Sequence, residues 1–376
     1  MPPLVRLVAA AVAALTCSQI STPPPEHRFC GWLYGSRNPA TMNTAYDTFA
    51  AHAAELDAVH PTWFHVTSLT DISARSVGFE DRRVMANTTT SGKRARLIPT
   101  VQAEDLPDRV FAHRIINDPA LRRRHVEALV ELTVSRGYDG LDLDYEHLGQ
   151  TLEPGQTTRT ERAAFSAFVT EAAQAMHAAG KELTLAVPVQ GGSPDEIYDY
   201  DALSAAADHV HIMGYDYHYE GGPHPGPVAP LGWIREVVAH AASIDGGSRK
   251  ERFVLSLPNY GLRGSVVCNP TLDCLAQAGE GYRTTTPHMK HEVVDPGRSP
   301  NQTLADGVEL YFDDITSLEE KVEAAAQAGL GGVGYWAIGG EPDRPGNRTF
   351  FQMVRSHFPQ RGATRAAGPD PRPSAP

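Results

Sequence analysis

The sequence predicts an α/β fold, a (β/α)8 TIM barrel with a small insertion between strand 7 and its helix. Eight short segments rich in apolar and β-branched residues alternate with segments of helical spacing along the 376 residues. Such alternation predicts a parallel sheet, and eight strands at this spacing close most economically as a barrel. An open doubly wound sheet is the alternative, but the first strand-to-helix turn lacks its phosphate-binding glycine pattern.

The strands are expected in sequence order. Their ranges are 28–34, 61–69, 94–101, 138–146, 182–189, 209–215, 252–258 and 332–336. Helices are expected over 44–58, 119–135 and 163–179. The first and third of these are rich in alanine, the strongest helix former. Residues 262–313 break the alternation, and their Gly, Pro and Thr content predicts an insertion on the face where the site is built.

The two ends of the chain differ from the predicted barrel of residues 28–359. Residues 1–20 combine a basic Arg6 with a short apolar run, which predicts a signal peptide and a secreted or cell-envelope protein. That run is too short to span a bilayer as a stable helix. Cys17 is a weak candidate for lipid attachment, because Thr16 precedes it. Residues 21–27 are expected to be a linker and residues 360–376 a disordered tail.

Charge and cysteine content narrow the partners. A net charge of −12 argues against nucleic acid or an anionic membrane as the main partner, and it leaves neutral glycans open. Cys268 and Cys274 are close enough in sequence for a local disulfide in an oxidising compartment. Cys30 lies in a predicted strand and is expected to be a buried thiol. No spacing of Cys and His resembles a zinc site, so we expect no metal. We also expect no cofactor, and we expect the chain to be a monomer.

The segment Asp-Gly-Leu-Asp-Leu-Asp-Tyr-Glu at 139–146 places three acids, Asp142, Asp144 and Glu146, on one face of a strand. Buried carboxylates repel one another and are costly, so they persist where charge is shared, neutralised or used. A solvated edge strand is disfavoured because the opposite face is apolar. An EF-hand calcium loop is disfavoured because His147 stands where that loop requires glycine.

This segment fits D-G-x-D-x-D-x-E, the signature of glycoside hydrolase family 18, which the chain resembles. A neighbouring acid raises the pKa of a proton donor, so Glu146 at the strand end suits a general acid, with Asp144 beside it and Asp142 tuning Asp144. The resemblance implies substrate assistance, an exception to the two-carboxylate rule. The 2-acetamido oxygen of the sugar attacks the anomeric carbon, Asp144 stabilises the oxazolinium ion, and Glu146 then activates water with retention of configuration.

Further matches follow in order along the chain. Met213-Gly214-Tyr215-Asp216 resembles the family's M-x-Y-D motif, which implies that Tyr215 holds the acetamido oxygen and that Asp216 contacts the distorted sugar. Trp336 lies in a segment that resembles the eighth strand, whose tryptophan floors the subsite of the reacting sugar. The remaining candidates for the cleft, with the last three the weakest, are Met213, Tyr260 in Leu-Pro-Asn-Tyr-Gly, Gln190, Trp32 and Tyr34.

Residues 222–230 (GPHPGPVAP) resemble a segment of family members grouped with bacterial spore-germination N-acetylglucosaminidases. The LysM repeats of many such proteins are absent, which leaves the substrate open. We expect an O-glycosyl hydrolase of the chitinase or N-acetylglucosaminidase type that cleaves β-1,4 linkages in chitin or peptidoglycan. The alternatives are a non-catalytic lectin-like protein that binds the same glycans, and an endo-β-N-acetylglucosaminidase acting on N-linked glycans. The sequence does not choose between exo and endo action.

Overall fold

The computed structural model describes most of the predicted barrel. The described residues are 28–35, 39–74, 79–93, 95–104, 107–150, 152–193, 195–223, 226–263, 266–268, 292–293, 310–341 and 349–359. The predicted signal peptide, linker and tail lie outside these residues, as does the lipid-attachment candidate Cys17. So do Cys274, the second cysteine of the predicted disulfide, and most of the predicted insertion.

Within the described residues, eight parallel strands form a closed barrel, as predicted. The second strand consists of β2 (Ala58–Pro61) and β3 (Phe64–Val66), and the third of β5 (Arg96–Leu97) and β6 (Thr100–Ala103). The others are β1 (Arg28–Leu33), β7 (Gly140–Tyr145), β8 (Glu182–Pro188), β9 (His209–Met213), β10 (Phe253–Pro258) and β15 (Gly332–Trp336). The ring closes because β15 pairs with β1, β1 with β2, and β3 with β6. A short β4 (Ile72–Ala74) pairs antiparallel with β3.

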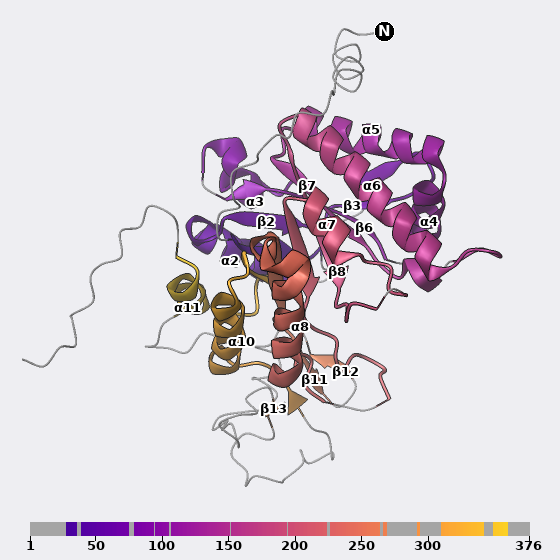
Figure 1. Ribbon diagram of the computed structural model, residues 1–376. Coiled ribbons are helices and arrows are strands. Elements are labelled where there is room, and N and C mark those ends of the chain that lie inside the picture. The colour runs from indigo at the N-terminus through magenta and orange to yellow at the C-terminus, as the bar shows by residue number, and fades with distance from the viewer. Residues whose placement is uncertain are drawn as a thin grey trace, which may run out of the picture.

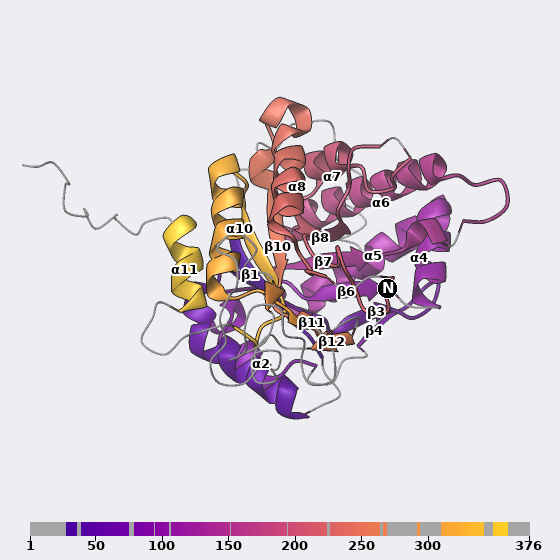
Figure 2. The same ribbon diagram turned by 90° about the horizontal axis from the view of Figure 1, so that it is seen from below.

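Helices surround the strands (Figures 1 and 2). They are α2 (Pro39–His52), α3 (Arg82–Ala86), α4 (Asp108–Asn117), α5 (Pro119–Arg136), α6 (Thr158–Ala178), α7 (Tyr200–Ala206), α8 (Leu231–Ser243), α10 (Ile315–Ala328) and α11 (Phe350–His357). Local sequence explains α5, which leads into β7. Asp118 caps its first turn by accepting hydrogen bonds from two backbone N–H groups, and Gly137 ends it in the left-handed region with φ of 72°.

The predicted boundary between the first helix and the second strand was wrong. The helix expected over 44–58 begins at Pro39 and ends at His52, and Ala58 already belongs to β2. The second strand therefore starts before Pro61, because Ala58, Val59 and His60 are fully buried between neighbouring strands. Burial by tertiary contacts overrides the helical preference of the Ala-rich segment there. No range was predicted for helices α3, α4, α7, α8, α10 and α11.

The predicted insertion is confirmed in position. Between β10 and α10, four short segments pair as an antiparallel sheet: β11 (Gly261–Arg263), β12 (Val266–Cys268), β13 (Glu292–Val293) and β14 (Leu310–Tyr311). This sheet lies at one end of the barrel, at the bottom of Figure 1. It follows directly on Pro258, the C-terminal end of a barrel strand, where such folds carry their variable loops.

The two faces of β7 differ as the alternation of its residues predicts. Leu141, Leu143 and Tyr145 are buried in the large apolar cluster shared with the helices, and the Tyr145 hydroxyl lies 2.5 Å from Nε2 of His125 on α5. The acids of the strand occupy the opposite face and point into the barrel. The main hydrophobic core therefore lies between the strands and the surrounding helices, and the interior of the barrel can carry polar side chains.

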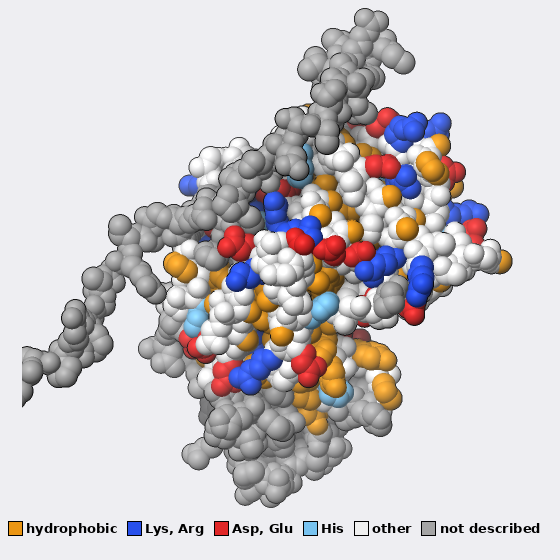
Figure 3. Space-filling model, in the orientation of Figure 1, with side chains coloured by type: hydrophobic (Ala, Val, Ile, Leu, Met, Phe, Trp, Pro, Cys, Tyr) orange, Lys and Arg blue, Asp and Glu red, His pale blue; other side chains and the backbone are white. Residues whose placement is uncertain are grey.

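Figure 3 shows one face of the molecule, on which acidic and basic side chains are interspersed over the helices. Among the described residues, no helix combines the length and apolar character needed to cross a membrane.

Gly332→Ala is expected to lower the free energy of unfolding by about 1–3 kcal/mol. A Cβ at Gly332 would lie 1.9 Å from the backbone oxygen of Arg28, so β1 and β15 would have to move apart. Gly232 in α8 has no atom within 4 Å of an added Cβ. Gly232→Ala is therefore the control and should be neutral or stabilising by up to about 1 kcal/mol. Urea unfolding compares the two, and an unchanged stability of Gly332→Ala would contradict this close approach.

Candidate active site

Asp142, Asp144 and Glu146 lie one after another along the inner face of β7, from the buried interior of the barrel to the C-terminal end of the strand. The exposed fraction is 0% for Asp142 and 4% for Asp144. It rises to 18% for the side chain of Glu146, which follows the strand directly. The ladder predicted from the sequence is therefore present, and its last member lies at the C-terminal end of the strand, where barrel enzymes place their reactive groups.

Asp142 is held by hydrogen bonds from three other strands. Trp32 Nε1 and Thr100 Oγ1 donate to its Oδ2 at 3.1 and 3.0 Å, and Thr184 Oγ1 donates to its Oδ1 at 2.7 Å. Both oxygens are thus satisfied although the residue is fully buried. This network fixes the base of the ladder.

Asp144 is the least satisfied of the acids. Gln102 Nε2 donates to its Oδ2 at 3.2 Å, whereas its Oδ1 is buried and has no hydrogen-bond partner among the described residues. Burial raises the pKa of the Asp144 carboxyl well above its ordinary value, and the charges of Glu146 and Glu104 raise it further. Asp144 therefore holds a proton under conditions in which an exposed aspartate has lost it.

Glu104, at the end of β6, brings another carboxylate close to Asp144 and Glu146. Carboxylate oxygens of Glu104, Asp144 and Glu146 all lie within 4.8 Å of one another, and Gln102 Nε2 also donates to Glu104 at 3.3 Å. Acids this close titrate as a set and share protons.

Glu146 is flanked by groups that shape its surroundings. His147 Nε2 lies 4.0 Å from its Oε2, and His147 adopts a left-handed backbone with φ of 56°. Tyr198 donates its hydroxyl to the carbonyl of Tyr145 at 2.7 Å. Burial raises the pKa of Tyr198, and the charges of Glu146 and Asp144 add to this, so the hydroxyl stays protonated beside the acids.

The end of β9 brings a tyrosine to the acids. Tyr215 is partly buried, and its pKa is raised by burial and then by the charges of Asp144 and Glu146, so its hydroxyl remains a donor. Asp216 is exposed, accepts a hydrogen bond from the Tyr260 hydroxyl and has φ of 59°. Left-handed backbone in residues other than glycine is strained and concentrates at functional sites. The two left-handed residues of this site, His147 and Asp216, directly follow Glu146 and Tyr215.

Aromatic side chains line the same end of the barrel. The Trp336 ring centroid lies 6.4 Å from that of Trp32 and 5.6 Å from that of Tyr34, which is 48% exposed. Trp336 and Tyr215 both pack against the apolar cluster that contains Tyr260. Met213, 9% exposed, packs with Trp32 in the cluster inside the barrel.

Gln190 was predicted to bind substrate, but its described contacts are not with the acids of the site. Its Nε2 donates to the carbonyl of Val189 at 2.8 Å, and its Oε1 accepts from the backbone N–H of Tyr198 at 3.4 Å. The described contacts of this side chain are thus with the loop after β8 rather than with the acids.

The sequence contained a signal for the residues that were missed. Thr100 and Gln102 pair in register with Asp142 and Asp144, so every second residue from Thr100 to Glu104 faces the acid ladder. The third strand was predicted to end at residue 101. Extending the same alternation past that point would have placed Gln102 and Glu104 in the site.

Acids and aromatic rings gathered at the C-terminal ends of the strands of a closed barrel form a site suited to the hydrolysis of glycosidic bonds. The chain belongs to the glycosyl hydrolases family 18, whose family model matches residues 111–341.

The chain is similar to several curated proteins of known sequence. It is 25% identical over 340 residues to the Bacillus subtilis (strain 168) protein named "Putative sporulation-specific glycosylase YdhD", covering 85% of this chain and 74% of that protein. It is 26% identical to the cortical fragment-lytic enzyme of the same organism and to chitotriosidase-1 of Mus musculus. These matches cover 60% and 58% of this chain, and the chain spans about half the length of either protein.

Solved structures share the fold. A class V chitinase from Pseudomonas fluorescens Pf-5 superposes with a TM-score of 0.70 at 24% identity, covering 89% of this chain and 99% of that chain. The spore cortex-lytic enzyme SleL of Bacillus megaterium QM B1551 superposes with a TM-score of 0.66 at 17% identity, covering 94% and 81%.

Proposed function

We propose that this chain is a secreted hydrolase that cleaves β-1,4 linkages of N-acetylglucosamine-containing glycans by retaining, substrate-assisted catalysis. The observation that carries the proposal is the pair of adjacent acids at the end of β7. Glu146 is partly exposed, and burial raises the pKa of the Asp144 carboxyl beside it well above its ordinary value, so a proton can be shared between the two acids. The proposed catalytic unit is a monomeric barrel of residues 28–359, and the apolar run within residues 1–20 supports export.

In the first step, Glu146 gives its proton to the glycosidic oxygen as the bond to the anomeric carbon breaks. The acetamido oxygen of the same sugar attacks that carbon from the opposite face, and a bond forms between them. The product is a cyclic oxazolinium ion, and the positive charge is shared between its nitrogen and oxygen. No protein side chain forms a covalent bond, so one acid at the strand end suffices.

Asp144 and Tyr215 are the groups we assign to the acetamido substituent. The Tyr215 hydroxyl, kept protonated by its buried position, donates to the acetamido oxygen and orients it for attack. As substrate binds, Asp144 passes its proton to Glu146, turns its ionised carboxylate toward the acetamido nitrogen and stabilises the positive charge that develops there. Asp142, fixed by its three donors, contributes a charge that helps to raise the pKa of Asp144.

In the second step, the ionised Glu146 takes a proton from a water molecule. The water oxygen attacks the anomeric carbon from the face that the leaving group vacated, and the bond to the acetamido oxygen breaks. Two inversions give net retention of configuration.

Aromatic and polar side chains at the strand ends are assigned to binding. Trp336 provides a flat surface for the apolar face of the reacting sugar, with Tyr34 beside it. Asp216, held by the Tyr260 hydroxyl, is placed to accept hydrogen bonds from sugar hydroxyls. Met213 and Gln190 complete the proposed binding set, and Gln190 has the weakest support because its side chain contacts the loop backbone.

The names of the relatives favour two substrates, cell-wall glycan and chitin. A non-catalytic lectin-like role is disfavoured because both acids of the pair are present and lie close together. The proposal is tested by digesting purified peptidoglycan, colloidal chitin, N-acetylchito-oligosaccharides and an N-linked glycoprotein, with mass analysis of the products. We expect fragments ending in N-acetylglucosamine from the first three. Binding to these glycans without any cleavage across the pH range would overturn the assignment as a hydrolase.

A further inference from the structure

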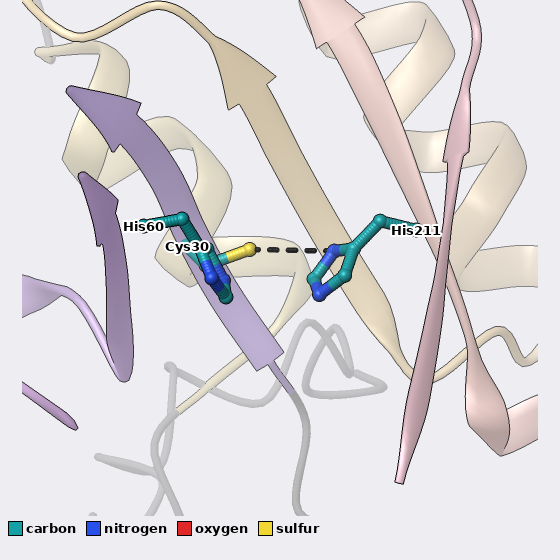
Figure 4. Close-up of side chains that lie close together, drawn as sticks. All are labelled: Cys30, His60 and His211. Atoms are coloured by element: carbon teal, nitrogen blue, oxygen red, sulfur yellow. Dashed lines mark hydrogen bonds between the residues drawn. The ribbon is translucent and has the colours of Figure 1, made fainter. Parts of the chain in front are cut away.

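A second cluster of reactive side chains lies inside the barrel, and the proposed mechanism does not use it. Cys30 on β1, His60 on β2 and His211 on β9 are each 0% exposed, and one ligand atom from each lies within 4.8 Å of the others. Figure 4 shows the Cys30 thiol directed at the His211 ring, with His60 beside it. The cluster adjoins the base of the acid ladder, because Trp32 stacks on His60 at 4.9 Å and donates to Asp142.

The separations suit a tetrahedral metal. Cys30 Sγ lies 3.7 Å from His211 Nδ1. A tetrahedral ion with bonds of about 2.3 Å to sulfur and about 2.0 Å to nitrogen would hold these two atoms about 3.5 Å apart. The same distance also fits a weak hydrogen bond of the Cys30 thiol, and the 4.0 Å contact from Cys30 Sγ to the carbonyl of Val333 is at the limit of that range.

The orientation of His60 is that of a metal ligand. Its Nδ1 lies 3.1 Å from the backbone oxygen of Ile98, which can only accept, so Nδ1 carries the hydrogen and Nε2 carries a free lone pair. Histidines that bind metals commonly donate their other ring N–H to a backbone carbonyl in this way. His60 is thus oriented before any ligand arrives.

Several polar atoms in this layer lack a partner. His60 Nε2 and Ser256 Oγ are buried without a hydrogen-bond partner among the described residues; His211 Nε2 also lacks one, and it carries the ring hydrogen when His211 Nδ1 binds the ion. Such atoms are costly, and each requires a physical explanation such as a bound ion or water.

We propose that Cys30, His60 and His211 bind one divalent zinc ion that ties β1, β2 and β9 together beneath the catalytic acids. One sulfur and two imidazole nitrogens form a ligand set that zinc prefers over magnesium or calcium. The fourth position is left for a water molecule, for which Ser256 is a nearby partner. On binding, the Cys30 thiol loses its proton to solvent and the thiolate forms the metal–sulfur bond.

The surrounding charges permit a cation. Asp142 accepts a hydrogen bond from Trp32, whose ring stacks on His60, so a carboxylate lies near the cluster and favours a cation there. Arg28 opposes it, but its guanidinium is paired with Glu182 at 2.5 Å, which offsets much of that charge. The expectation of no metal rested on sequence spacing, and these three ligands are too far apart in sequence to form any spacing motif.

The test uses the full chain, refolded with Co²⁺ or Zn²⁺ and freed of loose metal by dialysis. We expect one metal ion per chain by elemental analysis. Co²⁺ should give the intense visible bands of tetrahedral coordination and a thiolate charge-transfer band in the near ultraviolet. Cys30→Ser should lose the charge-transfer band and bind metal at least tenfold more weakly. His125→Gln is the control, because His125 is equally buried but lies outside the barrel interior and should leave binding unchanged.

Two results would overturn the proposal. One is a folded wild-type chain that retains no stoichiometric Co²⁺ or Zn²⁺, in which case buried water is the better explanation of the unpartnered atoms. The other is a Co²⁺ spectrum with no thiolate band, or one that Cys30→Ser does not change. The wild-type spectrum decides even if a variant fails to fold.

Discussion

Glu146→Gln is expected to lower kcat on N-acetylated chito-oligosaccharides by a factor of about 10²–10⁴ or more. The amide cannot give a proton to the leaving oxygen or take one from water, so both steps lose their catalyst. The side chain is partly exposed, and the substitution preserves its size, so the melting temperature should change little. Steady-state kinetics with thermal unfolding of the same samples measures both quantities.

The matched control is Glu153→Gln, the same chemical change on an exposed side chain a short distance further along the chain, 54% exposed beside Arg114. It should leave kcat unchanged. If Glu146→Gln kept the wild-type rate, another residue would have to be the proton donor. A loss of rate accompanied by unfolding would show instead that Glu146 is needed for the fold.

Asp144→Asn is expected to lower kcat by a factor of about 10²–10³, because an amide cannot stabilise the positive charge of the oxazolinium ion. The same change should raise stability at neutral pH by on the order of 1 kcal/mol, since it removes a buried acid whose Oδ1 has no partner. Opposite effects on rate and on stability are the expected pattern for a residue kept for chemistry.

The stability difference between Asp144→Asn and the wild type should depend on pH in a defined direction. The pKa of Asp144 is raised in the folded state above the 3.8 of an ordinary aspartate, so the folded chain binds more protons than the unfolded one in that interval. Wild-type stability therefore falls as pH rises through the interval, and the variant lacks this loss. The stability gained by Asp144→Asn should grow with rising pH and level off above the folded pKa. A variant less stable than wild type at every pH would contradict the assignment.

Local pattern was sufficient to predict the barrel and the residues on β7. A single alternating segment placed Asp142, Asp144 and Glu146 on one face, and the positions of the eight strands held although their ends shifted. Helix α5, which precedes β7, could be predicted because the residues that begin and end it, Asp118 and Gly137, lie next to it in the sequence. The family signature then indicated which strand ends to search.

What could not be predicted depends on contacts between distant strands. Ala58 begins a strand because its neighbours in the barrel bury it, although the preceding sequence favours helix. Glu104 joins the site only because β6 lies beside β7 in register. Cys30, His60 and His211 meet inside the barrel from three strands, and no local spacing carries that information.

Substrate assistance is tested most directly by removing the assisting group from the substrate. We would compare kcat/KM for an N-acetylated chito-oligosaccharide with that for the de-N-acetylated oligosaccharide of the same length. Without the acetyl group no oxazolinium ion can form, and a loss of about 10³-fold or more is expected, within the range that a well-placed intramolecular group contributes. Equal rates on the two sugars would contradict catalysis by the substrate's own acetamido oxygen.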